Sequence, residues 1–597
     1  MAEYSAPLRD MRFVLEHLVD LEAVTALPGY EEVDPEAVYA VLEENARFME
    51  DLVAPLNRVG DVQGSVRNDD GTVTTPEGFA DAYRAYVEAG WNGVAFPSDY
   101  GGGGFPWLVG VAMQEILTSA NMAFSMCPLL NQGAIDMLLH HASEEHKETY
   151  LPKMVTGEWT GTMNLTEPQA GSDVGALTTR AVPQPDGSYR ITGTKIFISF
   201  GEHDMSENIV HLVLARTPDA PPGTKGISCF IVPKRILRDD GSLGERNDVT
   251  CVSIEHKMGI KASPTCVLSY GDRGEGAVGF LIGEENAGMR YMFTMMNNAR
   301  LSVGLEGLSL AERAYQMALA YAHERKQGRA PGAPPGHQSA IIEHPDVRRM
   351  LLTQKACIEA LRGVVYLNAA AIDQSSHGAD EAARAAGQER ADLLTPVSKG
   401  WGTDLGVELT SLALQVFGGM GYIEETGVAQ HYRDARIAPI YEGTNGIQAM
   451  DLVGRKLPLR GGAAVADYLA TIEGTVGELR GAGDDLASIA SALADALASL
   501  RTATDWLLEH GLADPLDALA GATPYLRLFS TVTGGWVMAR QALAATGLLD
   551  AAEEADKAFY EGKVLTARFF CEQILPQAGA LVPAVTATNR DLAAAPL

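Results

Sequence analysis

The segment YRITGTKIFIS, residues 189–199, is rich in β-branched and aromatic residues and contains one glycine. Three similar runs follow it: ENIVHLVLAR at 207–216, GISCFIVPK at 226–234 and TCVLSYGD at 265–272. Short runs of this kind, bounded by Gly, Pro and Asp, are typical of antiparallel strands. They predict a compact antiparallel β domain at 161–285.

Helical periodicity flanks this β region on both sides. Residues 38–56, VYAVLEENARFMEDLVAPL, carry apolar residues at spacings of three and four, as one face of a helix requires. Long segments of the same kind return from Asn286 and are joined by short loops, which predicts a helical bundle. Beyond a linker near 457–462, the chain is alanine-rich and helical.

The predicted fold class is therefore α+β, with four domains. They are a helical N-terminal domain at 1–160, a central β domain at 161–285, a helical bundle at 286–457 and an additional helical extension at 461–597. The Gly-, Pro- and Ala-rich segment 328–338 is predicted to be an insertion without regular structure.

The charge balance narrows the classes of function. The 597 residues include 46 Lys and Arg against 77 Asp and Glu, a formal net charge of −31. Nucleic-acid phosphates require a concentrated basic surface, and an anionic membrane attracts basic segments. Neither nucleic acid nor a membrane is therefore an expected partner.

The distribution of cysteines and the charges of the N-terminal residues indicate that the protein is located in the cytoplasm. The six cysteines are scattered, with no C-x-x-C pair and no metal-ligand spacing, so we expect reduced, mostly buried thiols and no metal site. Glu3 and Asp10 lie where a secretory signal would be basic. The nearly uncharged stretch 116–135 contains Asn121 and Pro128, which predicts a buried helix with a break in place of a membrane span.

A glycine pattern typical of phosphate-binding loops occurs as GEGAVG at 274–279. In a dinucleotide-binding fold, this pattern leaves a strand and opens a helix. Here the strand-like run Phe280-Leu-Ile282 follows at once. The pattern therefore predicts a β-hairpin or loop, and no nicotinamide-binding fold.

Two segments near the β region concentrate residues suited to binding, although each also has a plain structural explanation. MNLTEPQAGSD at 163–173 is either an ordinary turn-rich loop or a binding loop. In KIFISFG at 195–201, Phe197 and Ser199 share one face of the predicted strand. The pair is either part of the core or a platform for a flat heterocycle with a hydrogen-bonding edge.

Three later segments likewise have both a structural and a functional interpretation. Arg325 follows a long helix, where a cation complements the helix dipole or reaches a pyrophosphate. QVFGGMGY at 415–422 has three glycines where a helix cap needs one, which indicates close approach to the backbone. Glu442, in IYEGTNGIQ at 440–448, is a lone carboxylate of the kind that is ordinarily solvated.

In this order, the segments resemble those of the acyl-CoA dehydrogenase family, from about residue 40 to 457. Six motifs carry the resemblance: TEPQAGSD at 166–173, KIFISFG at 195–201, ARLSVGLEG at 299–307, ERK at 324–326, QVFGGMGY at 415–422 and IYEGTNGIQ at 440–448. The opening YSAPLRDMRFVL at 4–15 and the helical tail most resemble the branch that acts on 3-(methylthio)propanoyl-CoA.

The resemblance implies that the central β domain is a barrel and that the chain is an FAD enzyme. The implied reaction is α,β-dehydrogenation of an acyl-CoA thioester to a trans-2-enoyl-CoA, with Glu442 as the base for the α-proton and flavin N5 as hydride acceptor. An electron-transfer flavoprotein would accept the electrons. An apolar pocket suits this base, because burial raises the pKa of a carboxyl. The implied substrate is a short or methylthio-substituted acyl-CoA.

The resemblance also assigns roles to individual residues. The flavin contacts would be Met163, Leu165, Thr166, Phe197 and Ser199. The FAD pyrophosphate and adenosine side would be held from a neighbouring subunit by Arg325, Gln415, Gly418 and Gly419, which requires at least a dimer. The cofactor pocket would be completed by Thr444 and Asn445, and the acyl-CoA would contact Ser172, Asn297, Arg300 and Tyr441.

Several alternatives remain open at this point. An acyl-CoA oxidase that uses O2 shares the base and a long helical tail, and a long-chain or aromatic acyl-CoA dehydrogenase shares the motifs. A non-catalytic scaffold or nucleic-acid binder is opposed by the acidic balance and by the intact Tyr441-Glu442-Gly443.

The extension at 461–597 has two possible roles. It holds 17 acidic and 8 basic side chains, so an anionic membrane would repel it. We expect instead that it covers a surface that shorter relatives use to form tetramers, which leaves a homodimer.

Overall fold

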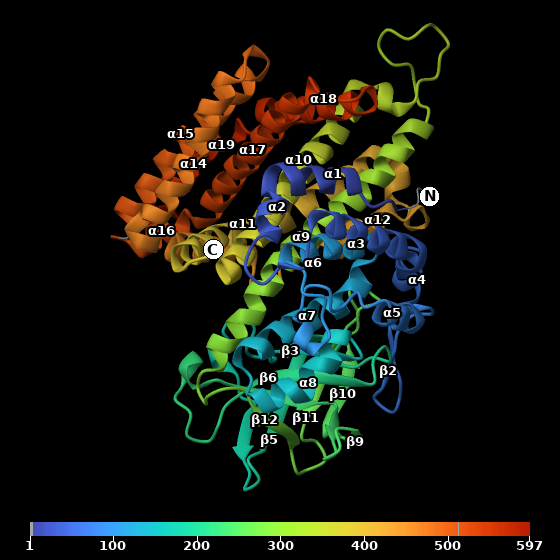
Figure 1. Cartoon of the computed structure of the whole chain (residues 1–597), viewed down its shortest axis with the longest axis vertical. Coiled ribbons are helices and arrows are strands. Elements are labelled where there is room, and N and C mark those ends of the chain that lie inside the picture. The colour runs from blue at the N-terminus through green and yellow to red at the C-terminus, as the bar shows by residue number, and fades with distance from the viewer. Residues whose placement is uncertain (1–3, 512, 597) are drawn as a thin grey trace. The chain divides into compact units, whose positions relative to one another are not determined.

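The computed structural model describes residues 4–511 and 513–596 (Figure 1). Residues 1–3, 512 and 597, which belong to the predicted N-terminal domain and the predicted extension, lie outside the described residues. The chain divides into two compact units. The first unit comprises residues 1–44, 106–115 and 300–597, and the second comprises 45–105 and 116–299.

The second unit contains the predicted β domain as one eight-stranded sheet. Its strands are β3 (Trp159–Asn164), β4 (Arg180–Pro183), β5 (Tyr189–Ser199), β6 (Asn208–Ala215), β7 (Ser228–Pro233), β10 (Val249–Ile254), β11 (Thr265–Tyr270) and β12 (Ala277–Leu281). They are ordered β10-β11-β5-β12-β7-β6-β3, with β4 paired to β5. The pair β3–β6 is parallel, and the others are antiparallel. Closure of this sheet into a barrel stays a prediction.

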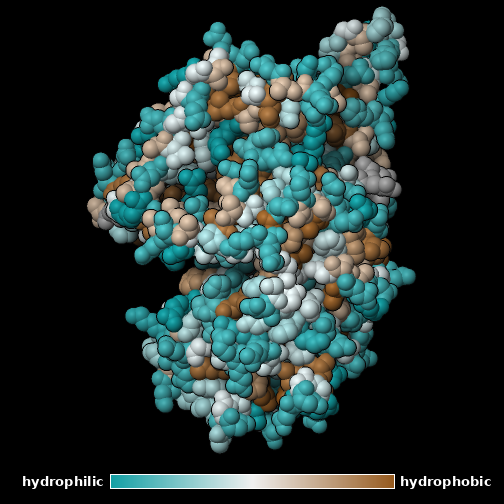
Figure 2. Space-filling model, in the orientation of Figure 1, coloured by the Kyte–Doolittle hydropathy of each residue, from teal (hydrophilic) through white to brown (hydrophobic). Residues whose placement is uncertain are grey.

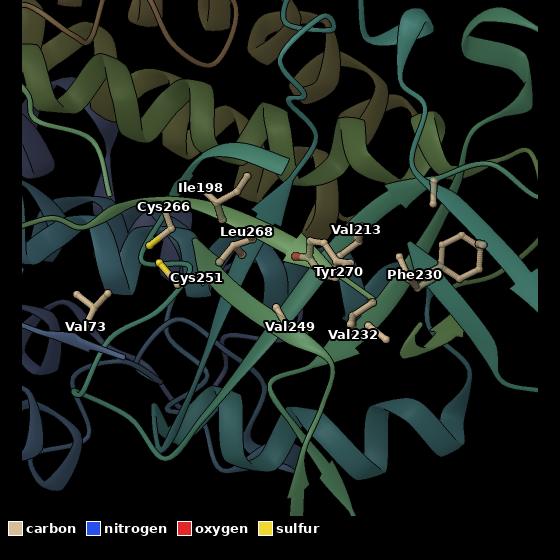
Figure 3. Close-up of a cluster of buried hydrophobic side chains, with 14 residues drawn as sticks. Val73, Ile198, Val213, Phe230, Val232, Val249, Cys251, Cys266, Leu268 and Tyr270 are labelled. Atoms are coloured by element: carbon tan, nitrogen blue, oxygen red, sulfur yellow. The ribbon is translucent and has the colours of Figure 1, made fainter. Parts of the chain in front are cut away.

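A cluster of buried side chains determines which face of β5 is inward. Ile198 lies in this cluster with Val213 of β6 and Leu268 of β11 (Figure 3). Neighbouring residues of a strand point to opposite faces. Phe197 and Ser199, on either side of Ile198, accordingly lie outside the core, and the Phe197 residue is 59% exposed.

The rest of the second unit contains helices and short hairpins. The helices are α4 (Leu56–Gln63), α5 (Phe79–Glu88), α7 (Met122–His141) and α8 (Glu144–Thr156), and the hairpins pair β1 (Val66–Arg67) with β2 (Val73–Thr74) and β8 (Arg235–Leu237) with β9 (Leu243–Arg246). The prediction of a β-hairpin or loop for GEGAVG is confirmed, because residues 274–276 lie in the loop after β11 and residues 277–279 begin β12. The predicted helix break is also confirmed, since Asn121 Oδ1 accepts the Phe124 N–H (3.1 Å) and caps α7.

The β1–β2 hairpin departs from the prediction of a purely helical segment before residue 160. Its two strands are only two residues long, too short to show an alternating pattern. The turn Asp69-Asp70-Gly71 was the available signal, and Gly71 has a φ of +84°.

The first unit is helical, as predicted for the bundle and the extension. The helices before the extension are α1 (Leu8–Val14), α2 (Leu21–Thr25), α3 (Pro35–Phe48), α6 (Trp107–Ala120), α9 (Gly288–Glu324), α10 (Pro345–His377), α11 (Glu381–Phe417), α12 (Val428–Ala435) and α13 (Asn445–Asp451). Those of the extension are α14 (Ala463–Gly481), α15 (Ala487–Trp506), α16 (Pro515–Ala520), α17 (Ala522–Leu549), α18 (Glu554–Phe569), α19 (Gln577–Thr586) and α20 (Arg590–Ala594). Parts of α3, α6 and α9 belong to the second unit.

Helices α9 and α11 cross with their backbones in contact. A Cβ atom added to Gly304 would lie 2.3 Å from the carbonyl oxygen of Ser398, and one added to Gly307 would lie 2.0 Å from that of Gly402. Real Cβ atoms do not approach a carbonyl oxygen so closely, so only glycine fits at these positions. The crossing fixes the position of the α9 residues 300–307 relative to the middle of α11.

The extension packs directly on the bundle. Helix α17 lies beside α10 and α11 (Figure 1) and also packs against α13. A Cβ atom added to Gly400 of α11 would lie 2.6 Å from Leu526 Cδ2, and one added to Gly363 of α10 would lie 2.4 Å from Val537 Cγ1. The extension is therefore part of the support of α11.

The surface agrees with the composition. On the face drawn in Figure 2, hydrophilic residues predominate and apolar residues form small scattered groups. All six cysteines are buried and free of disulfide bonds, as predicted. Within residues 4–511 and 513–596, we find no helix with the length and apolar character needed to cross a membrane.

Candidate active site

Glu442 occupies an unusual backbone conformation in the segment between α12 and α13. Its φ is +56°, in the left-handed region. For a residue other than glycine, such a conformation costs about 1–3 kcal/mol and persists only where the surrounding structure holds it. Strain of this kind is common at functional sites.

The residues after Glu442 hold this conformation from one side. The side-chain amide of Gln448 donates to the carbonyl oxygens of Glu442 (3.4 Å) and Gly443 (3.3 Å). The Thr444 hydroxyl accepts the N–H of Ile447 (3.3 Å) and caps α13.

Asn445 ties the same segment to α11. Its Oδ1 accepts from Lys399 Nζ (2.9 Å), and its Nδ2 donates to Asp404 Oδ1 (2.7 Å) and to the Gly400 carbonyl (3.0 Å). The sequence predicted a cofactor contact for Asn445; in the structure its side-chain amide forms hydrogen bonds to α11.

Two cations lie near the half-buried Glu442 carboxyl. Burial raises the pKa of Glu442 to about 7, and the positive charges of Arg300 and Lys399 oppose this rise. Burial likewise lowers the pKa of Lys399 to about 8, against the attraction of Glu442 and Glu306. A carboxyl with a pKa near neutrality is well matched to a general base.

Arg300 is buried close to Glu442. Its residue is 6% exposed, and its Nη1 lies 3.9 Å from Asp451 Oδ2. A Cβ atom added to Gly443 would lie 3.8 Å from Arg300 Nη2. The structure thus brings together Arg300, Tyr441, Glu442, Thr444 and Asn445 of the predicted site.

Sequence reasoning missed two charged residues of this site. Lys399 lies within a helical segment, and Glu306 was noted only as a letter of the ARLSVGLEG motif. The signal for Glu306 was an acidic residue in the otherwise uncharged run 301–311. In the structure Glu306 is fully buried, and the Tyr441 hydroxyl donates a hydrogen bond to its Oε2.

The predicted flavin contacts lie in the second unit, around a bulge in β5. Between the pairs Lys195–Leu268 and Ile198–Cys266, two residues of β5 lie opposite one residue of β11. Phe197 is in this bulge and has a φ of +59°. The bulge presents an exposed aromatic ring next to the half-buried Ser199.

The loop after β3 is bound to the same strand. The Ile196 N–H donates to the carbonyl oxygen of Thr166 (2.9 Å), and Lys195 Nζ donates to that of Leu165 (3.0 Å). Lys195 also forms a buried ion pair with Glu167 Oε1 (2.9 Å). The structure therefore gathers Leu165, Thr166, Phe197 and Ser199, with Met163 half-buried at the end of β3.

A third group lies at the ends of α9 and α11. The rings of Tyr321 and Phe417 stack there with centroids 4.2 Å apart. Arg325, Gln415, Gly418 and Gly419 are all exposed at these ends. A Cβ atom at Gly418 or Gly419 would meet nothing within 4 Å, so packing does not require these glycines, although the φ of +61° at Gly418 favours glycine there.

Ser172 and Asn297 are the remaining predicted substrate contacts. Both are exposed in the second unit, Ser172 in the loop after β3 and Asn297 on the first part of α9.

The donor set fits FAD and offers no metal site. An exposed ring beside a hydroxyl suits a flat heterocycle, and open glycine backbone with an exposed guanidinium suits a pyrophosphate. In the described part of the chain, no group of three or more His, Cys, Asp or Glu could hold a metal ion.

Family models match nearly the whole chain. They are the acyl-CoA dehydrogenase N-terminal domain at 36–158, middle domain at 162–272 and C-terminal domain at 286–457, followed by an acetyl-CoA dehydrogenase C-terminal-like domain at 465–596.

Individual proteins match over the full length. The chain is 48% identical over 594 residues to 3-methylmercaptopropionyl-CoA dehydrogenase of Ruegeria pomeroyi, covering 100% of both. It is 38% identical over 591 residues to a butyryl-CoA dehydrogenase of Syntrophomonas wolfei, covering 96% of this chain and 95% of the relative. The crystal structure of Caenorhabditis elegans ACDH-11 in complex with C11-CoA shares the fold, with a TM-score of 0.76 at 19% identity over 99% of this chain and 95% of that one.

Proposed function

The chain belongs to the acyl-CoA dehydrogenase family, and we propose that Glu442 is the base of its reaction. It is an FAD-dependent enzyme that converts an acyl-CoA to a trans-2-enoyl-CoA. The observation that carries the assignment of Glu442 is its half-buried carboxyl, whose pKa is raised to about 7 and whose backbone is held in a strained conformation.

Bound FAD supplies the acceptor for the β-hydrogen, which leaves as hydride. Glu442 removes the α-proton as a carboxylate, so one hydrogen leaves each of the two carbons and a double bond forms between them. Negative charge develops on the thioester oxygen, and by the family pattern the backbone N–H of Glu442 would donate to it. Arg300 and Lys399 stabilise the carboxylate form that accepts the proton.

The cofactor contacts carry over from the family pattern as proposals. The flavin ring would contact Met163, Leu165, Thr166, Phe197 and Ser199, with Thr444 and Asn445 completing the pocket. The exposed Phe197 ring supports this assignment. On the substrate side, Ser172, Asn297 and Tyr441 would contact the acyl-CoA, and Arg300 would act near the thioester end because it lies beside Gly443.

We propose 3-(methylthio)propanoyl-CoA, or a similar short acyl-CoA, as the substrate. The support is the full-length relative at 48% identity, which is named for that compound, against 38% for the butyryl-CoA dehydrogenase. The test is anaerobic reduction of the bound flavin by a panel of short, methylthio, long-chain and aromatic acyl-CoAs. A preference for long-chain or aromatic compounds would overturn the substrate and leave the reaction intact.

The rate of flavin reduction should rise with pH through about 7. Glu442 acts as a base only when ionised, and its pKa lies above the ordinary value of 4.5 because of burial. Below pH 7 the rate should therefore fall about tenfold per pH unit. Stopped-flow measurements of the second-order rate constant at low substrate concentration between pH 5 and 9 test this, because that constant reports the pKa of the free enzyme. A rate constant that is flat down to pH 5 would contradict it.

We propose a homodimer in which each FAD is shared between two copies. From Arg300 to Glu324, α9 extends about 36 Å at 1.5 Å per residue. From Lys399 to Gln415, α11 extends about 24 Å. We infer from these separations that the Glu442 end and the Arg325 end serve two different cofactors. The apolar residues exposed near the second end support contact with another copy: Met420, Tyr422 and Ile423.

Tyr422→Asp is expected to convert the dimer to monomers and to release FAD. Tyr422 is 90% exposed in the single chain, and the proposed dimer would bury it. An aspartate at this position would bury a charge in the interface, which is strongly unfavourable. Light scattering and flavin absorbance measure the two effects. Leu592→Asp, at an exposed leucine of α20, is the matched control and should change neither. A stable tetramer of the unmodified protein would contradict the dimer.

We further propose an electron-transfer flavoprotein as the electron acceptor, and the cytoplasm as the compartment. Assaying peroxide against flavoprotein reduction separates this acceptor from O2. The proposed domain limits are 1–160, 161–285, 286–457 and 461–597, and limited proteolysis tests them.

A further inference from the structure

We propose that Glu306 is a positioning residue for this reaction, which fixes the Tyr441–Glu442 peptide through the Tyr441 hydroxyl. The inference rests on the proposed role of Glu442 as the base. It goes beyond that role because it assigns a function to Glu306, a residue of α9 that lies outside the segment 440–448.

Glu306 is itself rigidly placed. It is 0% exposed and lies between Gly304 and Gly307, the two residues whose backbone touches α11. Because α9 cannot move closer to α11 without a clash of backbone atoms, the Glu306 side chain starts from a well-defined position.

The Glu306 carboxyl holds the far end of Tyr441. The Tyr441 hydroxyl donates to Glu306 Oε2, while the Tyr441 N–H donates to the carbonyl oxygen of Ile437 (3.3 Å). Tyr441 is thus held at both its ring and its backbone. The next peptide carries the N–H of Glu442, and Gln448 holds the other side of that residue.

The other oxygen of Glu306 marks the residue as unusual. Its Oε1 is buried and has no hydrogen-bond partner among the residues that the structure describes. A buried carboxyl oxygen without a partner costs about 1–3 kcal/mol, and an apolar side chain of similar shape would avoid that cost. The stability of the fold therefore does not explain why a glutamate occupies position 306, whereas its hydrogen bond with Tyr441 does.

The surrounding charges indicate that Glu306 works as an uncharged acceptor. Two charged groups influence the pKa of Glu306: Glu442, and Lys399 of α11. Asp434 of α12 influences the pKa of Tyr441. Arg300 lies on α9, the same helix as Glu306. Burial and the Glu442 charge raise the pKa of Glu306 to about 8, against the hydrogen bond from Tyr441 and the charge of Lys399, which lower it. A neutral carboxyl accepts from Tyr441 without repelling the ionised base, so glutamine should replace it.

The test compares Glu306→Leu, Glu306→Gln and Tyr441→Phe in the FAD-loaded enzyme. Glu306→Leu should lower the rate constant of flavin reduction about 10–100-fold, with KM changed less than about threefold, because misplacement of the reacting groups acts on the chemical step. Glu306→Gln should restore the rate to within about threefold at pH 7. The double variant of Glu306→Leu and Tyr441→Phe should be no slower than the slower single variant, since both remove one contact.

Two outcomes would overturn the inference: an unchanged rate in Glu306→Leu, or a loss in Glu306→Gln as large as in Glu306→Leu. If Glu306→Leu does not fold, the unchanged rate of Tyr441→Phe would overturn it equally. Glu312→Gln, at another buried acid of α9, which pairs with Arg362, is the control and should keep its rate per bound FAD.

Glu442→Gln is measured beside these variants. If Glu442→Gln reduces flavin at the unmodified rate, the proposed function of Glu442 fails. If Glu442→Gln is inactive while both Glu306→Leu and Tyr441→Phe are fully active, only the inference about Glu306 fails.

Discussion

Replacing Glu442 with Gln is expected to slow flavin reduction by acyl-CoA about 10²–10⁴-fold or more. The amide has nearly the same shape as the carboxyl but cannot take the α-proton. The Gln448 contacts to the backbone of residues 442 and 443 do not involve the carboxyl, so the strained segment should keep its conformation. FAD content and thermal stability should therefore be close to those of the unmodified enzyme. Anaerobic stopped-flow measurement of flavin bleaching gives the rate.

The matched control is Glu425→Gln. Glu425 is an exposed glutamate in the short helical turn before α12, and its change should leave the rate of flavin reduction unaltered. A Glu442→Gln enzyme that holds FAD and reduces it at the unmodified rate would remove Glu442 from the mechanism, whatever the family pattern.

Gly307→Val is expected to prevent native packing of α9 on α11. Even a Cβ atom would lie 2.0 Å from the carbonyl oxygen of Gly402, and the two methyl groups of valine have no space at this crossing. Overpacking a core commonly costs about 1–3 kcal/mol, and a backbone clash of this kind lies at or above the upper end of that range. We expect little soluble protein and no bound FAD, because the crossing positions Arg300, Glu306 and Lys399.

Glycine substitutions elsewhere in a helix supply the control. A Cβ atom at Gly474 of α14 would meet nothing within 4 Å. Gly474→Ala should therefore raise the free energy of unfolding by about 0.4–1 kcal/mol, through loss of freedom in the unfolded chain. Gly307→Ala should have the opposite sign. Thermal melts of both variants, together with flavin absorbance, measure these effects; a stabilised Gly307→Ala would contradict the close crossing.

The C-terminal extension, residues 461–597, accounts for the length of the chain and packs against the helices of the bundle. Among the described residues of the extension, 461–511 and 513–596, we find no group of His, Cys, Asp or Glu that could hold a metal ion, and none of the proposed site residues lies there. Leu526 and Val537 of α17 nevertheless pack against Gly400 and Gly363, so the extension supports the helix that carries Lys399. The chemistry and the extension are therefore linked through packing, which sequence periodicity could not show.

The amino-acid sequence by itself determined the elements of this protein. The β-branched run at 189–199, the turn that leads into a strand at 274–279 and the break at Asn121 depend on neighbours in the chain, and the structure confirms all three. Motif order also identified the family, which local physics alone did not: on its own, Glu442 had the pattern of a solvated surface carboxylate.

Only the tertiary structure decided the electrostatics of the site. A pKa depends on burial and on charges in space. The charges that act on Glu442 come from positions 300 and 399, which the glycine crossing of α9 and α11 brings together. No local pattern encodes that crossing, because a glycine in a helix looks the same whether it faces solvent or another backbone. For the same reason the sequence could assign Arg300 to the substrate but not show that it is buried beside the proposed base.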